Sequence, residues 1–385
     1  MVYVKSVSNG AMDGRSFQLL ETLRQEQAIN QAIAEADPLG VDASLHMLPL
    51  LNEQKKVVAI GDFLEQAVAR AQKQSKGDYI HSSAAIRDIC MFAASLISYG
   101  IEPNERVPGF SQTLLDFSSA TKSHIPRDSF IDYTSRNPEG GRERRFTSRS
   151  EEGIFIDSLR RGMAALDACL QELMQACHFS FVQQGFAEHC SAAAHNFQIM
   201  IDAIVQVKRG ITTEVFTHYI RPFFEPFTVE GRAYSAPSGA EMSILNIDLI
   251  IWGSDCQDEL YTPYVQANII RLPAVYQEIC QLFVGQKSLI TLLQETVTSG
   301  RHLCKDERNS VHALHSLLTK MYSFRMPHYK VVEDNVKLRL KETGGGEVKG
   351  SSGFGIDEVK YVLDQTMKSR QLLSHILMED SARAS

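Results

Sequence analysis

Apolar residues recur at helical spacing along most of the chain, and the clearest case follows Gly153. From residue 155 to residue 177 the apolar positions are three or four residues apart, the spacing of one face of an α-helix. A second apolar stripe begins near Ser310, and the next position on it is His328, so this histidine is expected to face the interior. The two stripes consist of Phe155, Leu159, Met163, Leu166, Leu170, Leu173 and Cys177, and of Leu314, Leu317, Met321 and Phe324.

Strand signals are scarce, and the pattern predicts an all-α protein. Residues 227–235 are expected to form at most a short extended excursion. The polar, basic stretch 136–150 predicts an exposed connection between an N-terminal helical portion, 1–135, and a C-terminal one, 151–385. Residues 344–355 contain six glycines and predict a mobile loop before a C-terminal helix that begins near Ile356.

Composition and charge exclude several classes of function. The 385 residues are 44% hydrophobic, enough for a large core, and the net charge of -7 gives no reason to expect nucleic acid as a partner. No apolar stretch approaches 18 residues, and the N-terminus lacks an apolar signal segment, so no membrane association is expected. The seven scattered cysteines include no C-x-x-C pair, which indicates buried thiols in a cytoplasmic protein.

The strongest candidate for chemistry is the segment 324–328, FRMPH. A neutral imidazole on an apolar helical face is a suitable axial ligand for haem iron, and Arg325 lies on nearly the same side, where it can pair with a propionate. Pro327 predicts a helix kink just before the histidine. From spacing alone, however, a hydrogen-bonded core histidine is the commoner explanation of His328.

A family resemblance changes that balance. The segment 324–332 resembles the proximal-histidine segment of the indoleamine/tryptophan 2,3-dioxygenase superfamily, and it is closer still to the monodechloroaminopyrrolnitrin synthases. Segments 37–39 and 85–89 are similar to the latter alone. The resemblance implies a multi-helix bundle of the indoleamine 2,3-dioxygenase type that binds haem b, with His328 on the iron and Arg325 beside the cofactor.

Further segments resemble the family in the same order along the chain: 123–133, 153–159, 215–223, 234–243 and 349–353. Their match implies that Arg221 holds the substrate carboxylate, that Ser351 closes over the substrate on the glycine-rich loop, and that Ser238 approaches both haem and substrate. The other residues that inherit places around the substrate are Phe130, Tyr133, Phe155, Ser158 and Phe216.

The resemblance implies a haem-dependent oxidative enzyme that uses dioxygen and an unidentified electron donor. Its expected substrate is L-tryptophan or a chlorotryptophan, and its reaction is either dioxygenation of the indole ring or rearrangement to an aminophenylpyrrole. Two rival hypotheses belong to other classes. One is a sensor that binds haem or tryptophan without turnover, and the other is an all-α interaction protein in which His328 is ordinary core.

Overall fold

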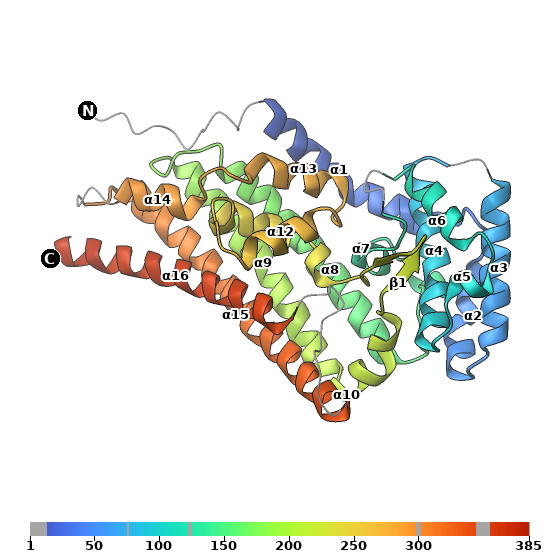
Figure 1. The fold of residues 1–385 in the computed structure, drawn as a ribbon. Coiled ribbons are helices and arrows are strands. Elements are labelled where there is room, and N and C mark those ends of the chain that lie inside the picture. Colours follow the sequence, from blue (N-terminus) through green and yellow to red (C-terminus); the bar gives the residue numbers. More distant parts are fainter. Residues whose placement is uncertain (1–13, 75–76, 122–124, 298–301, 344–354, 385) are drawn as a thin grey trace.

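The computed structural model describes residues 14–74, 77–121, 125–297, 302–343 and 355–384, and within them the chain is almost entirely helical, as predicted (Figure 1). The α-helices are α1 (Gly14–Glu35), α2 (Asp42–Glu53), α3 (Val57–Lys73), α4 (Tyr79–Ser98), α5 (Pro103–Arg106), α6 (Phe110–Ser118), α7 (Phe130–Tyr133), α8 (Ser150–Ala176), α9 (Gln184–Gly210), α10 (Thr213–Val215), α11 (Ile244–Asp248), α12 (Tyr261–Ile269), α13 (Ala274–Phe283), α14 (Leu289–Val297), α15 (Lys305–Thr343) and α16 (Ile356–Ala384).

Short elements interrupt these helices at several places. Three are 3-10 turns, η1 (Gly140–Arg142), η3 (Arg221–Phe223) and η4 (Gly239–Glu241), and two are π-helical, η2 (Phe216–Ile220) and η5 (Leu249–Gly253). The predicted extended excursion is an antiparallel hairpin of β1 (Phe227–Val229) and β2 (Arg232–Tyr234), in which Phe227 pairs with Tyr234.

Four long helices form the main body of the protein. α8 packs against α9, α9 against α15, and α15 against α16, so the two helices that carry the predicted apolar stripes, α8 and α15, both pack against α9 (Figure 1). α15 continues without a break through Pro327 and carries His328 in its C-terminal half. The C-terminal helix begins at Ile356, as predicted.

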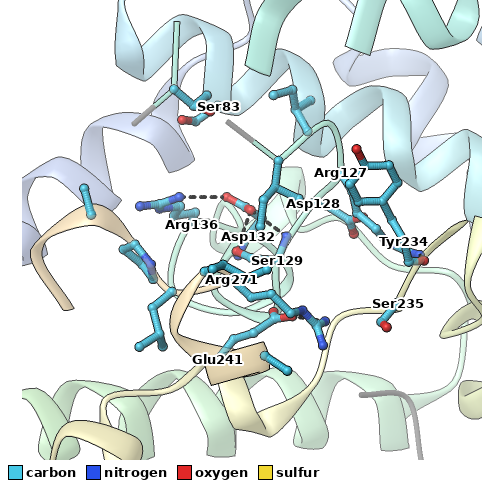
Figure 2. Close-up of a pocket in the computed structure, with 18 of the residues that line it drawn as sticks. Ser83, Arg127, Asp128, Ser129, Asp132, Arg136, Tyr234, Ser235, Glu241 and Arg271 are labelled. Carbon is cyan, nitrogen blue, oxygen red and sulfur yellow. Dashed lines mark hydrogen bonds and ion pairs between the residues drawn. The ribbon is translucent and has the colours of Figure 1, made fainter. Parts of the chain in front are cut away.

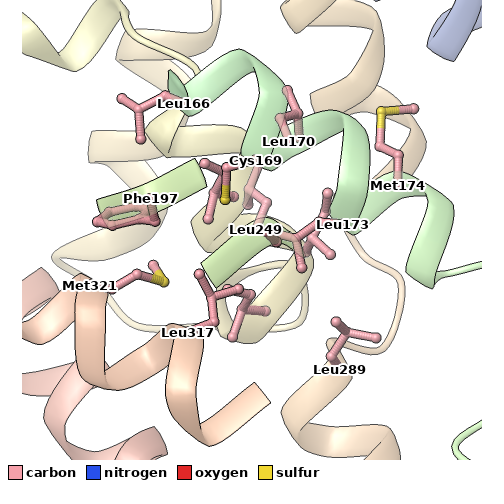
Figure 3. Close-up of a cluster of buried hydrophobic side chains, with 14 of the residues drawn as sticks. Leu166, Cys169, Leu170, Leu173, Met174, Phe197, Leu249, Leu289, Leu317 and Met321 are labelled. Carbon is pink, nitrogen blue, oxygen red and sulfur yellow. The ribbon is translucent and has the colours of Figure 1, made fainter. Parts of the chain in front are cut away.

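The larger hydrophobic core lies where these helices meet. Figure 3 shows Leu166 and Leu170 of α8, Phe197 of α9, and Leu317 and Met321 of α15 in one cluster of buried side chains. All five side chains are almost inaccessible to solvent. Burial of this apolar face, rather than helix propensity alone, stabilises the row of helices.

The second core is built by the N-terminal helices α2, α3, α4 and α6 together with residues 207–236. Phe155 of α8 packs against both cores, and Phe146 and Ile156 also belong to the second one. Each core therefore draws side chains from both predicted portions of the chain. α4 is long and apolar enough to cross a membrane, but most of it is buried inside the protein, as in a core helix.

The prediction that residues 136–150 form an exposed connection is wrong. The side chains of Arg136 and Arg144 are buried, and each forms ion pairs with acidic residues of the N-terminal helices. Arg136 Nη2 lies 3.2 Å from Glu26 Oε1, and Arg144 Nε lies 3.3 Å from Asp88 Oδ1. The composition of this stretch suggested that it is exposed, because arginine is rarely buried unless it is paired. The acidic partners lie far away in the sequence, so the pairing could not be seen there.

Candidate functional site

His328 lies on the apolar stripe of α15, with its ring stacked on Phe324 at a centroid distance of 5.6 Å. Burial, assisted by the positive charge of Arg325, lowers the pKa of His328 to about 4, so the imidazole is neutral at physiological pH. No hydrogen bond joins this ring to any residue that the structure describes. A neutral, unpaired imidazole has a nitrogen lone pair available to a metal.

Arg325 is held by the protein. Its Nη2 donates to both oxygens of Asp248, at 2.6 and 2.5 Å, and its Nη1 donates to Thr366. Asp248 also accepts a hydrogen bond from Trp252 Nε1 at 3.1 Å. The two charges are buried and neutralise each other. This geometry gives no support to the predicted contact with a haem propionate, which stays a prediction.

Four of the predicted substrate residues form one aromatic cluster, centred on Phe155. Its ring lies 5.5 Å from Phe216, 6.3 Å from Phe130 and 6.3 Å from Tyr133, measured between centroids. Edge-on and tilted contacts of this kind favour a fixed arrangement of the rings. The structure therefore brings together residues from α7, α8 and η2 that are up to 86 residues apart, 130 to 216.

Local structure fixes α7, the short helix that presents two of these rings. The Ser129 hydroxyl accepts a hydrogen bond from Asp132 N, and the Asp132 carboxylate accepts one from Ser129 N, which completes a capping box. The hydroxyl of Tyr133 donates to Glu152 Oε1 at 2.8 Å. Glu152 is fully buried and also accepts hydrogen bonds from the backbone of residues 146 and 147. Sequence reasoning missed Glu152, whose place in the first turn of a helix suggested only a charge near a helix N-terminus.

Phe224 is a second residue that sequence reasoning missed. Its ring packs edge-on against Tyr133 at 5.0 Å, so the aromatic cluster continues toward the 3-10 turn that carries Arg221. The run of aromatic residues after Arg221 was a visible signal of this contact.

Ser158 and Ser238 are buried and their hydroxyl oxygens have no hydrogen-bond partner among the residues described. Ser158 lies one turn after Phe155 on the same face of α8. Ser238 precedes η4, whose Glu241 accepts a hydrogen bond from Phe130 N at 2.6 Å. Unpaired buried hydroxyls are rare in native proteins. Their occurrence at the two positions where the resemblance puts haem and substrate fits a site that binds both.

Arg221 lies in η3, directly after the π-helical turn η2. Its Nη1 donates to Glu225 Oε1 at 2.9 Å and to the carbonyl of Phe224. Burial lowers the pKa of Arg221, and the nearby charge of Arg339 on α15 lowers it further. Thr217 of η2 donates to Asn335 on α15 at 2.7 Å. The Arg221 segment is therefore attached to the helix that carries His328, a juxtaposition that spacing did not predict.

Ser351 and all of the predicted loop 344–355 except Gly355 lie outside the described residues. The predicted roles of the individual site residues stay predictions. The structure shows that Phe130, Tyr133, Phe155 and Phe216 lie together. The neutral imidazole of His328 suits haem iron, and the unpaired hydroxyls of Ser158 and Ser238 suit a small ligand.

The family model of monodechloroaminopyrrolnitrin synthase PrnB matches residues 27–329 of the chain. The matched range includes His328, Arg221 and the complete aromatic cluster. The family consists of haem-dependent oxidative enzymes that act on tryptophan-type substrates, and its all-α fold is that of the indoleamine/tryptophan dioxygenase superfamily. Because the match covers well over half of the chain, this protein belongs to the monodechloroaminopyrrolnitrin synthase PrnB family of enzymes.

Proposed function

We propose that this enzyme binds haem b through His328 and oxidises L-tryptophan or a chlorotryptophan with dioxygen. The observation that carries the proposal is the neutral imidazole of His328, which is half-buried beside Phe324, has no hydrogen-bond partner in the described chain and lies inside the family match. When bound, haem supplies the activation of dioxygen. An electron donor is needed to keep the iron ferrous.

The side chains around the substrate bind and orient it and exclude water. The rings of Phe130, Tyr133, Phe155 and Phe216 offer an apolar, aromatic surface for an indole ring. Arg221 provides a planar guanidinium for the carboxylate of an amino acid, and Ser351 provides a hydroxyl near the same end of the substrate. The carboxylate nearest to the cluster that we describe, Glu152, accepts hydrogen bonds from Tyr133 and from the backbone of residues 146 and 147, so we assign it a role in positioning the cluster.

The family name favours oxidative rearrangement to an aminophenylpyrrole over opening of the indole 2,3-bond. Rearrangement also fits an aromatic surface that holds a reacting ring in one orientation. The cytoplasm is the compartment we propose, because all seven cysteines are free thiols and five of them are buried.

The test is product formation by the haem-loaded enzyme with reductant, dioxygen and either L-tryptophan or 7-chlorotryptophan, analysed by mass spectrometry. We expect an aminophenylpyrrole from at least one substrate. A product with an opened indole ring would show that the enzyme is a dioxygenase. Binding of either substrate without any product would support the sensor hypothesis.

The matched variants are His328→Ala and His315→Ala. His315 lies on the same helix but is hydrogen-bonded to Ser374 of α16 at 2.9 Å. We expect His328→Ala to lose the Soret band and all turnover while keeping its helical circular dichroism, and His315→Ala to keep both. Full haem retention by His328→Ala would contradict the assignment of the ligand.

A further inference from the structure

Figure 2 shows a cavity of about 340 Å³ beside α7, with Arg127 and Glu241 among the side chains of its walls. These two residues belong to the segments 123–133 and 234–243, which the resemblance assigns to haem and substrate, so the cavity is part of the site already described. A different feature is a row of oxidisable aromatic side chains that begins near Arg325 and does not line this cavity.

The aromatic row consists of Trp252, Tyr261 and Tyr361, and it begins at Trp252, the single tryptophan of the chain. Trp252 lies in the π-helical turn η5, and its Nε1 donates at 3.1 Å to Asp248, the residue that binds Arg325. Arg325 lies one turn before His328 on α15. Hydrogen bonds and one turn of helix therefore join the indole of Trp252 to the proposed haem ligand. π-helical turns are frequent at functional sites.

Two tyrosines continue the aromatic row toward the surface. The ring of Tyr261 in α12 lies 4.7 Å from that of Trp252, and the ring of Tyr361 in α16 lies 5.9 Å from that of Tyr261, measured between centroids. Gly253 allows Tyr261 to lie against η5, because a Cβ atom there would lie 3.0 Å from Tyr261 Cε1. Trp252 and Tyr261 are buried, whereas Tyr361 is partly exposed. The row therefore runs from the interior to the surface.

The two ends of the row have groups that assist the loss of an electron. An indole or a phenol is easier to oxidise when a neighbouring carboxylate stabilises the positive charge or takes up the proton. The carboxylate of Asp248 accepts the N–H of Trp252. Asp258 lies beside the hydroxyl of Tyr361, and hydrogen bonds from the backbone of residue 260 and from this hydroxyl lower the pKa of Asp258, so its carboxylate is ionised.

Tyr261, between the two ends, has a different role. Its hydroxyl is buried and has no hydrogen-bond partner among the residues that the structure describes. Burial raises the pKa of Tyr261 well above its usual value, and the negative charge of Asp248 raises it further. Without an acceptor for its proton this phenol is hard to oxidise. Its ring instead bridges Trp252 and Tyr361, because electron transfer between aromatic rings is fast near contact and slows steeply with distance.

We propose that Trp252, Tyr261 and Tyr361 form an electron-transfer path from the surface to the haem site, used when a hydroperoxide oxidises the enzyme in the absence of substrate. The path rests on the haem site proposed above. Its function is to remove the unused oxidising equivalent from the aromatic cluster that holds the substrate.

The electrons and protons of the proposed step balance. Reduction of one hydrogen peroxide to two waters takes up two electrons and two protons. The iron supplies one electron, and Tyr361 supplies the other by way of Trp252. The phenolic proton of Tyr361 passes to Asp258 and from there to solvent, and solvent provides the two protons that the peroxide takes up.

The experiment is rapid freezing of the haem-loaded enzyme after an equimolar addition of hydrogen peroxide without substrate, followed by electron paramagnetic resonance. We expect the signal of a tyrosyl radical. Tyr361→Phe keeps the ring and removes the phenol, so most of this signal should be lost. Tyr322→Phe is the matched control and should keep the signal, because Tyr322 is also partly buried between α15 and α16, against Arg370, but lies outside the row. A full signal in Tyr361→Phe, or equal losses in both variants, would overturn the proposal.

Two further variants test the route. Trp252→Phe removes the indole, so we expect the tyrosyl signal to be lost although Tyr361 is intact. Tyr261→Phe should keep the signal, because only the ring of Tyr261 bridges its neighbours, and loss of a hydroxyl without a partner disturbs the fold little. A signal of wild-type size in Trp252→Phe would contradict the route.

Mass spectrometry of the wild type after repeated peroxide additions is a measurement that needs no variant. We expect oxygen to be added at Trp252 and Tyr361, and oxidation confined to Tyr133 and Phe155 would contradict the path. The Soret band of each sample separates the two proposals. A wild type that binds no haem would overturn the proposed function and the path with it, whereas haem binding without a tyrosyl radical would overturn the path alone.

Discussion

At the scale of single residues, Arg221 is the residue that we expect to bind the carboxylate of the substrate. Its guanidinium is mostly buried and shares an ion pair with Glu225. We expect Arg221→Ala to raise the dissociation constant for L-tryptophan about tenfold or more, because a hydrogen bond to a charged group contributes roughly 1.5–3 kcal/mol. The measurement is a titration of the haem absorbance with L-tryptophan.

Indole is the control ligand for that titration, because it lacks the carboxylate. We expect the same indole affinity in the wild type and in Arg221→Ala. An equal loss for indole and tryptophan would mean that Arg221 supports the fold through Glu225 and the carbonyl of Phe224. Ser351→Ala should have a smaller effect on tryptophan, since a neutral hydrogen bond contributes about 0.5–1.5 kcal/mol.

Asp167 on α8 predicts a specific pH dependence of stability. Burial raises its pKa to about 7, although hydrogen bonds from Ser243 and Tyr276 oppose the shift. Between pH 4 and pH 7 the folded protein keeps a proton that the unfolded chain has lost, so this group makes the free energy of unfolding fall as pH rises, by up to about 1.4 kcal/mol per pH unit. Above pH 7 its contribution is constant.

The variant Asp167→Asn removes that contribution and keeps an acceptor for Ser243. We expect urea unfolding to show a stability advantage of the variant that grows from pH 5 to pH 7 and is largest at pH 8. If the free energy of unfolding changed with pH in the same way in the wild type and in the variant, the raised pKa of Asp167 would be contradicted.

Individual residues differ in how far the sequence alone could place them. The orientation of His328 followed from the apolar stripe of α15, because helical spacing fixes which residues share a face. The burial of Arg136 and Arg144 did not follow, because it depends on Glu26 and Asp88, more than 50 residues away in the chain.

At the scale of elements, the contact between α8 and α9 positions Phe155 and Ser158. Gly162 of α8 lies at this crossing, and a Cβ atom there would lie 2.6 Å from Met200 Sδ and 3.3 Å from Ala203 Cβ of α9. We expect Gly162→Val to lower the free energy of unfolding by about 1–3 kcal/mol, because the helices must move apart.

Gly14→Val is the control for that substitution. Gly14 begins α1, and nothing lies within 4 Å of a Cβ atom built there. Urea midpoints of the two variants separate crowding from any general effect of valine in a helix. If both variants change stability equally, the crowding argument fails. A smaller amount of bound haem in Gly162→Val would indicate that the crossing also supports the site.

The long helices were predictable because each buries one continuous apolar face, and the start of α16 followed from glycines that disfavour a helix. The π-helical turns η2 and η5 were not predictable, because a single extra residue in a turn leaves the apolar spacing almost unchanged. Both lie at the candidate site: η2 carries Phe216, and η5 directly follows Asp248, the partner of Arg325.

At the scale of the whole molecule, buried ion pairs join the connecting segment to the N-terminal helices. Arg87 of α4 donates to the carbonyls of Ile33 and Arg136, both at 2.8 Å, and to Asp88. Asp88 in turn accepts from Arg144. The segment 85–89, which resembles the family, therefore holds α1, α4 and the connection to α8 together, and does not contribute to the site directly.

Two arginines of the connecting segment bind the same carboxylate, and the effects of replacing them on stability can be compared. Arg142 and Arg144 both form ion pairs with Asp42, but the side chain of Arg142 is 38% exposed and that of Arg144 only 2%. We expect Arg144→Gln to lower the free energy of unfolding by about 3 kcal/mol or more, because it leaves the fully buried Asp88 with a single charged partner. Arg142→Gln should lower the free energy of unfolding by less than about 1 kcal/mol, since water replaces an exposed partner.

The measurement is urea unfolding of both variants at low and high salt. Only the loss of stability in Arg142→Gln should depend on salt, because its ion pair is exposed. Equal losses would mean that the connecting segment is held by its backbone, through Asn137 and its neighbours, and that the buried charges do not determine its position.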